Sequence, residues 1–136
     1  MKRYVVIVIL ALSVVVLFTA SAAPALACES YSPGYWMNHP EAWDGWTWIG
    51  YQPYTPAEAI QWMQTPPRGD KSISAFFTVA AAAADYYEGW GGDRSAAFAA
   101  ANAWVAAHPP GSKVAANSPE WQSIEPTIML LDATFE

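Results

Sequence analysis

The chain has 136 residues, of which 54% are hydrophobic and 15% aromatic, and it contains a single cysteine. This length fits one small domain, and one cysteine excludes a disulfide bond within the chain. Acidic residues outnumber basic ones by 12 to 6. This balance argues against nucleic acid or an anionic membrane surface as a partner, because both require basic patches on the protein.

The first 27 residues have the pattern of a secretory signal peptide. Lys2 and Arg3 precede an uncharged, mainly apolar stretch from Tyr4 to Phe18, and small residues then lead to Ala25-Leu26-Ala27. Basic, apolar and small-residue regions in this order predict export and cleavage. The apolar stretch is shorter than the roughly 20 residues of a membrane-spanning helix. We therefore expect a secreted or cell-surface protein, with an uncleaved N-terminal anchor as the alternative.

Cleavage after Ala27 would leave Cys28 at the new N-terminus. A bacterial lipobox has leucine three residues before the cysteine, whereas Ala25 holds that position here, so plain cleavage is favoured over lipidation. An unlipidated Cys28 is either free or paired with another chain. The predicted single domain, 28–136, carries 12 acidic and 4 basic residues, a net charge of −8. We expect membrane contact only through the signal segment or a lipid on Cys28.

Residues 28–54 are predicted to form an irregular arm rich in aromatic residues. The segment from His39 to Trp43 can make one helical turn, with Pro40 in the first position. The segment from Trp46 to Tyr51 can form a short extended or hairpin structure around Gly50. No long sheet is expected.

Residues 55–136 are predicted to be helical, and the first two helices have clear start signals. Thr55-Pro56-Ala57-Glu58 combines a capping box with proline in the first turn, which predicts a helix ending near Gln64. Asp70 or Ser72 is expected to cap the next helix, from about Lys71 to Tyr87. Its apolar residues recur at helical spacing, and the glycines at 89, 91 and 92 are expected to end it.

The C-terminal third is predicted to hold the remaining helices. Asp93 is expected to cap a helix over about 94–107, and Ser118 to start a further segment. Pro126 predicts a kink or restart, with a last helix over about 125–134. The sequence thus predicts an all-α domain, a small bundle of four or five helices with the aromatic arm packed across it.

The segment S-P-G-Y-W-M-N-H-P-E-A-W, from Ser32 to Trp43, resembles the T-x-G-Y-W-K-N-H-P-x-A-W signature of a widespread group of bacterial and archaeal secreted proteins. The resemblance continues in three further stretches: Tyr54-Thr55, Thr65 to Asp70, and Ala107 to Gly111. Met37 replaces the usual lysine, and Phe77-Thr78 replaces a His-Gln pair of the second helix. The group has no established activity, so the resemblance implies an exported surface domain and no particular chemistry.

The aromatic arm supplies the main candidates for ligand binding. They are Tyr35, Trp36, His39, Trp43, Trp46, Trp48 and Tyr51. Exposed Trp and Tyr rings can stack on sugars or anchor a protein contact. The alternative for each ring is burial in the core of a domain without disulfides. Because a thin arm cannot bury all of them, one or two of Trp46, Trp48 and Tyr51 are expected to stay exposed.

His39, with Glu41 and Asp44 nearby, defines an alternative site. A histidine beside carboxylates can bind Zn²⁺ or act as a general base. A metal site would need a third ligand, such as His108 or Asp85, and the spacing matches no known metal motif. The competing role of His39 is hydrogen bonding to the backbone.

The lack of known catalytic motifs in the sequence favours a protein without enzymatic activity. The sequence has no G-x-S-x-G or H-E-x-x-H motif and no G-x-G-x-x-G loop, so no cofactor is expected. We therefore expect an exported domain that binds a carbohydrate or another surface protein through residues 35–54. A metal-dependent hydrolase using His39 is one alternative, and a self-assembling surface-layer or filament subunit is another.

Overall fold

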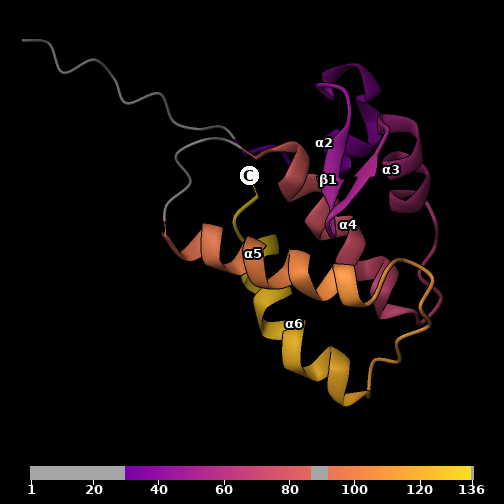
Figure 1. Ribbon diagram of the computed structural model, residues 1–136, viewed down its shortest axis with the longest axis vertical. Helices are drawn as coiled ribbons and strands as arrows, with labels where there is room; N and C mark the ends of the chain where they lie inside the picture. Colours follow the sequence, from indigo (N-terminus) through magenta and orange to yellow (C-terminus); the bar gives the residue numbers. More distant parts are fainter. Residues whose placement is uncertain (1–29, 87–91, 136) are drawn as a thin grey trace, which may run out of the picture.

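The computed structural model describes residues 30–86 and 92–135, and Figure 1 shows their arrangement. The predicted signal segment 1–27 and Cys28 lie outside these ranges. The elements are α2 (Pro33–Asn38), the 3₁₀ helix η1 (Pro40–Ala42), β1 (Thr47–Ile49), β2 (Gln52–Tyr54), α3 (Pro56–Met63), α4 (Lys71–Ala84), α5 (Gly92–Ala107) and α6 (Pro119–Asp132). The domain is mostly helical, but the expectation of an all-α fold is corrected by the two-stranded sheet. Over these two ranges, no helix has the length and apolarity needed to cross a membrane.

Three of the helices begin at a Ser-Pro or Thr-Pro pair. Thr55 caps α3 in the predicted capping box with Glu58, and the Ser118 hydroxyl accepts a hydrogen bond from the Trp121 amide at the start of α6. The Ser32 hydroxyl does the same for the Tyr35 amide at the start of α2. The helix α2 was not predicted, so the N-terminal arm is more regular than expected. The predicted turn at Pro40 is confirmed as η1.

Helix α4 is the centre of the fold, and α2, α3, α5, α6 and β1 all pack against it. As predicted, Asp70 caps its first turn by accepting a hydrogen bond from the Ser72 amide. Its buried residues are Ser72, Ile73, Ala75, Phe76, Thr78, Val79, Ala80, Ala81 and Ala82. The small alanine side chains allow neighbouring elements to approach closely. The helix ends at Ala84 instead of the predicted Tyr87, a residue outside the described ranges.

Of the kink or restart predicted at Pro126, the restart is wrong, because helix α6 is continuous from Pro119 to Asp132. A proline inside a helix removes one backbone hydrogen bond and costs about 3 kcal/mol. Buried side chains on both sides of the proline oppose a break, because each would leave the core if the helix turned away. These side chains are Trp121, Ile124, Ile128 and Leu131. Helix α5 begins at Gly92, two residues before the predicted start.

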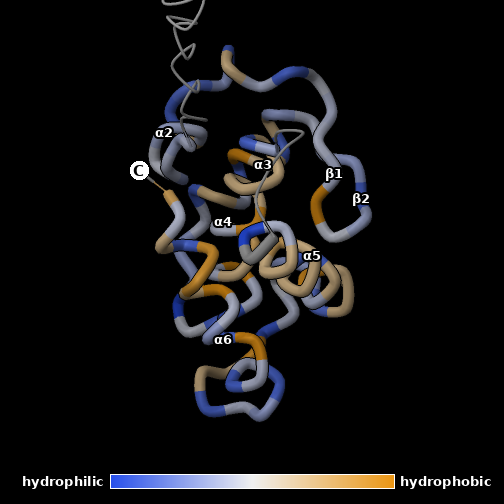
Figure 2. Tube along the Cα trace, turned by 90° about the vertical axis from the view of Figure 1, so that its left-hand side faces the viewer, coloured by the Kyte–Doolittle hydropathy of each residue, from blue (hydrophilic) through white to orange (hydrophobic). Residues whose placement is uncertain are grey.

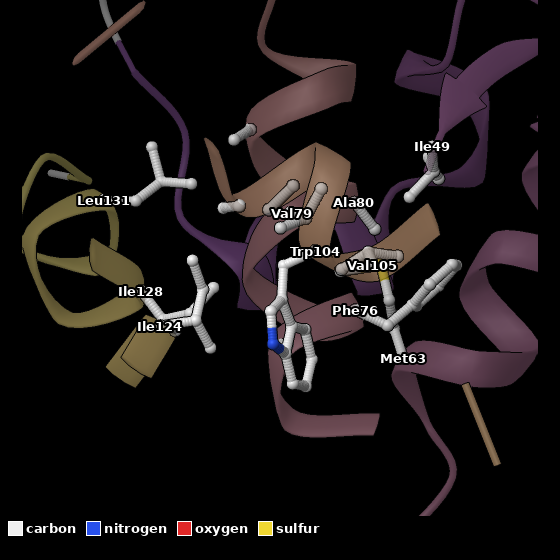
Figure 3. Close-up of a cluster of buried hydrophobic side chains, with 14 of the residues drawn as sticks. Ile49, Met63, Phe76, Val79, Ala80, Trp104, Val105, Ile124, Ile128 and Leu131 are labelled. Carbon is white, nitrogen blue, oxygen red and sulfur yellow. The ribbon is translucent and has the colours of Figure 1, made fainter. Parts of the chain in front are cut away.

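The core lies between α4, α5 and α6 and extends to α3 and β1. Figure 3 shows Ile124, Ile128 and Leu131 of α6 on one side of Trp104, and Ile49 and Met63 on the other. The Trp104 indole N–H donates a 3.1 Å hydrogen bond to the Glu120 carbonyl, which ties α5 to the start of α6. Large aromatic side chains contribute much of the buried area, as expected for a small domain without an internal disulfide.

The hairpin between β1 and β2 confirms the predicted extended segment around Gly50. Thr47 pairs with Tyr54, Trp48 with Pro53, and Ile49 with Gln52, so a two-residue turn closes the ladder. The turn residues have positive φ values, 57° at Gly50 and 61° at Tyr51. Positive φ at both positions is characteristic of a type I′ turn, whose twist matches that of the strands.

Candidate functional site

The hairpin presents two tryptophans to solvent. Successive side chains of a strand point to opposite faces, so Thr47 and Ile49 face one way while Trp46 and Trp48 face the other. Ile49 is buried in the core, whereas Trp46 and Trp48 are each 64% exposed. The alternation that inserts Ile49 into the core therefore holds both indole rings at the surface.

The tip of the hairpin is fixed to α5. The Gly50 amide donates a 2.6 Å hydrogen bond to the side-chain oxygen of Asn102. A Cβ atom at position 50 would lie 2.9 Å from a methyl group of Val105 and 3.0 Å from the Ala106 nitrogen. Only glycine fits this close approach at positive φ. In Figures 1 and 2 the hairpin accordingly lies beside α5 and away from α6.

Between the hairpin, the end of α4 and the middle of α5 lies a cleft of about 400 Å³, which we call the aromatic cleft. It is lined by Trp43, Asp44, Trp46, Thr47, Trp48, Ala83, Ala84, Tyr86, Phe98 and Asn102. Half of these side chains are aromatic, and they come from three segments of the chain. A volume in this range and a lining of this kind are typical of small-molecule sites.

The wall opposite the hairpin is held by a buried ion pair. Arg94 of α5 donates a 2.8 Å hydrogen bond to Asp85, which directly follows α4, and the Tyr31 amide donates to the same carboxylate at 3.1 Å. Burial raises the pKa of Asp85 and outweighs the opposing effect of these donors. Next to this pair, the rings of Tyr86 and Phe98 lie 5.9 Å apart. The ion pair thus links the end of α4, which Tyr86 follows by two residues, to the first turn of α5, which carries Phe98.

The aromatic cleft is also lined by polar residues. Asp44 carries a carboxylate, and Asn102, only 8% exposed, carries an amide. The amide oxygen of Asn102 is occupied by Gly50, and the side-chain nitrogen has no acceptor among the residues that the structure describes. Its N–H groups are therefore available to a ligand.

The structure separates the seven predicted ligand-binding residues into groups. Trp43, Trp46 and Trp48 come together in the aromatic cleft. Tyr51 is 60% exposed at the hairpin turn but does not line the cleft. We expected one or two of Trp46, Trp48 and Tyr51 to be exposed, and all three are at the surface.

The other three predicted residues lie elsewhere. Trp36 is 6% exposed in the core, where its carbonyl accepts a 3.0 Å hydrogen bond from the Trp43 indole N–H. Tyr35 stacks on His39 with ring centres 4.3 Å apart, and on Tyr31 with ring centres 4.2 Å apart. This stack is distinct from the aromatic cleft, whose lining does not include Tyr35, Trp36 or His39.

The candidate metal ligands are not gathered into a site. His39 Nδ1 lies 2.7 Å from a carboxylate oxygen of Glu41, and this hydrogen bond lowers the pKa of Glu41. His108 instead stacks on Trp104 and donates to the Trp104 carbonyl at 3.0 Å. Within the described ranges, no group of three or more His, Cys, Asp or Glu residues could hold a metal ion. The geometry therefore gives the hydrolase alternative no support.

Sequence reasoning missed the helical side of the cleft. Phe98 and Asn102 are one turn apart on α5, and Asn102 interrupts an otherwise apolar helix face that includes Ala101, Trp104 and Val105. A buried polar residue on an apolar face usually satisfies a specific partner. This pattern was a usable signal for Asn102, although it did not identify Gly50 as the partner.

Comparisons with known proteins found no relative of this chain. No protein-family model matches the chain, and no curated protein or solved structure is significantly similar to it.

Proposed function

We propose that this protein is a non-enzymatic carbohydrate-binding domain that acts outside the cytoplasm. The observation that carries the proposal is the pair Trp46 and Trp48, both 64% exposed and both lining a cleft that also contains polar groups. Neighbouring exposed aromatic side chains form an apolar patch, and such patches commonly mark interaction sites.

The chemistry of the cleft matches a sugar ring. One face of a pyranose presents C–H groups, which pack against the electron-rich face of an aromatic ring. The hydroxyls at the ring edge need both acceptors and donors. Asp44 supplies acceptors and Asn102 supplies donors. A protein partner would use exposed aromatics equally well, but it would gain less from a cleft of about 400 Å³ that is lined by both aromatic and polar residues.

The affinity for a short oligosaccharide is expected to be modest. Few contacts in an open cleft correspond to a Kd of about 0.1–1 mM, or about −4 to −5.5 kcal/mol. Isothermal titration with tetrasaccharides of the glucan, mannan, xylan and chitin types tests this directly. At least one should bind in this range.

A matched pair of variants locates the binding surface. Replacing Trp46 and Trp48 together by alanine should weaken binding at least about tenfold, since stacked aromatics dominate such contacts. Tyr51→Ala removes an equally exposed ring from the same hairpin but outside the cleft, and should leave affinity unchanged. Binding of none of the four sugars, or equal binding by the double variant, would refute the proposal.

Export rests on the N-terminal segment and has its own test. The intact mass of the protein from its native host, measured with and without reductant, should match a chain that begins at Cys28. An added mass of acyl chains would identify a lipid anchor, and a mass that halves on reduction would identify a disulfide dimer. A full-length mass would contradict cleavage.

A further inference from the structure

A second cleft lies between α4 and α6, beside the end of α3, and shares no lining residue with the aromatic cleft. We call it the α4–α6 groove, and its volume is about 440 Å³. Its lining is mainly apolar: Met63, Pro67, Ile73, Phe77, Trp121, Ile128 and Met129, with Thr65, Ser74, Thr78 and Asp132 as the polar members. This size and composition suit a small organic molecule.

Thr78 gives the groove a polar group. The residue is only 5% exposed, and its hydroxyl makes no hydrogen bond to any residue of the described ranges. A threonine in a helix commonly donates to the carbonyl four residues earlier, and Thr65 does so to Gln61 at 2.7 Å. A hydroxyl of a groove residue that has no protein partner can accept a hydrogen bond from a bound molecule.

Asp132 gives the lining of the groove a negative charge. Among the described residues that line the groove, it is the only one with a formal charge. Lys71 does not line the groove, and it holds its ammonium group 5.2 Å from the centre of the Trp121 ring. The predicted mature chain is also strongly acidic. The groove therefore favours a cation over an anion.

We propose that the α4–α6 groove binds a small amphipathic organic cation, an arylalkyl or alkyl ammonium compound. Its ammonium group pairs with Asp132 and supplies N–H donors for Thr78. Its apolar body lies against Met63, Ile73 and Phe77. Met129 is 66% exposed at the rim, and its flexible side chain can adapt to the shape of the ligand. This proposal uses none of the residues of the aromatic cleft, so either one can fail alone.

Three probes of nearly equal size and different charge test the proposal on the full protein. They are 2-phenylethylamine, 2-phenylethanol and 3-phenylpropionate. The amine should bind about tenfold more tightly than the propionate, with the alcohol between them, and the preference should shrink as salt is added. The Trp121 indole N–H resonance reports binding at the groove. No binding of the amine up to about 10 mM, or equal affinity for amine and propionate, would overturn the proposal.

Isosteric variants separate charge from packing. Asp132→Asn should weaken the amine about three- to fivefold and leave the alcohol unchanged. Thr78→Val should also weaken the amine, because it removes the hydroxyl that accepts the ammonium hydrogen bond and keeps the shape of the side chain. Asp44→Asn removes a carboxylate from the aromatic cleft and is the matched control, with no expected effect on the amine. Unchanged amine affinity in Asp132→Asn would contradict the assigned role of the carboxylate.

Discussion

The Gly50 amide and the Asn102 side-chain oxygen are joined by a 2.6 Å hydrogen bond that links the hairpin tip to the middle of α5. The two residues are 52 positions apart in the sequence. Both are buried, and the backbone at Gly50 lies close enough to Val105 to exclude any larger residue. The positions of Trp46 and Trp48 relative to α5 depend on this contact, and so does the shape of the aromatic cleft.

Gly50→Ala should destabilise the domain by about 2–4 kcal/mol. A Cβ atom there would meet Val105 at 2.9 Å while the backbone keeps φ at +57°, so overpacking adds to left-handed strain. Gly45→Ala is the control, because Gly45 has a φ of +73° but nothing within 4 Å of the added Cβ. It should cost about 1 kcal/mol. Urea unfolding measures both, and equal losses would contradict the close docking of the hairpin tip.

Trp43→Phe should be more destabilising than Trp36→Phe by about 1 kcal/mol. Both residues are buried, and the centres of their rings lie 5.6 Å apart. The Trp43 indole N–H donates to a carbonyl, whereas the Trp36 indole N–H has no acceptor within the described part of the chain. The first substitution removes a hydrogen bond, and the second removes an unsatisfied donor. Thermal unfolding compares them, and the reverse order would show that the hydrogen-bond assignment is wrong.

Asp70→Asn should destabilise the protein by about 1–3 kcal/mol near neutral pH. The Asp70 carboxylate accepts from the Ser72 hydroxyl and amide, and from the Lys113 and Val114 amides. An asparagine NH₂ would face one or more of these donors.

The same substitution should make the free energy of unfolding less dependent on pH in the acidic range. Burial raises the pKa of Asp70, but the hydrogen bonds from Ser72, Lys113 and Val114 together outweigh it, so the net pKa lies below the ordinary value of 3.8. The unfolded chain therefore takes up this proton first as the pH falls. The stabilisation is present above about pH 4 and is lost below it. The stability difference between wild type and Asp70→Asn should shrink from pH 6 to pH 3, and a constant difference would exclude this linkage.

Pro126→Ala should stabilise the protein by about 1–2 kcal/mol. Alanine restores a backbone N–H inside α6 and has a higher helix propensity. This stabilisation is larger than the cost of the extra conformational entropy that the unfolded chain gains when proline is replaced. Pro119→Ala at the first position of the same helix is the control and should give no gain, because that N–H has no helical partner. Equal effects of the two substitutions on the urea midpoint would argue that α6 is broken at Pro126.

Local signals in the sequence predicted local structure well. The capping box at Thr55, the cap at Asp70 and the hairpin around Gly50 are decided by residues within a few positions of one another. The Ser32-Pro33 pair carries the same signal as Thr55-Pro56, so α2 was accessible to the same reasoning.

The remaining features depend on contacts between distant segments. Pro126 is a local helix-breaking signal that the burial of Ile128 and Leu131 overrides. The aromatic cleft forms only when Trp48 meets Phe98 and Asn102, which are far away in sequence. Periodicity identifies the buried faces of α4 and α5, but it does not specify which faces meet the hairpin.

The most direct test of carbohydrate binding is a ¹H–¹⁵N spectrum of the tryptophan indole N–H groups, recorded while the tetrasaccharide that binds best is added. The Trp46 and Trp48 resonances should shift in proportion to the bound fraction, because both rings line the aromatic cleft. Those of the buried Trp36, Trp104 and Trp121 should stay in place. Shifts confined to these buried residues, or no shifts at saturating sugar, would contradict the account.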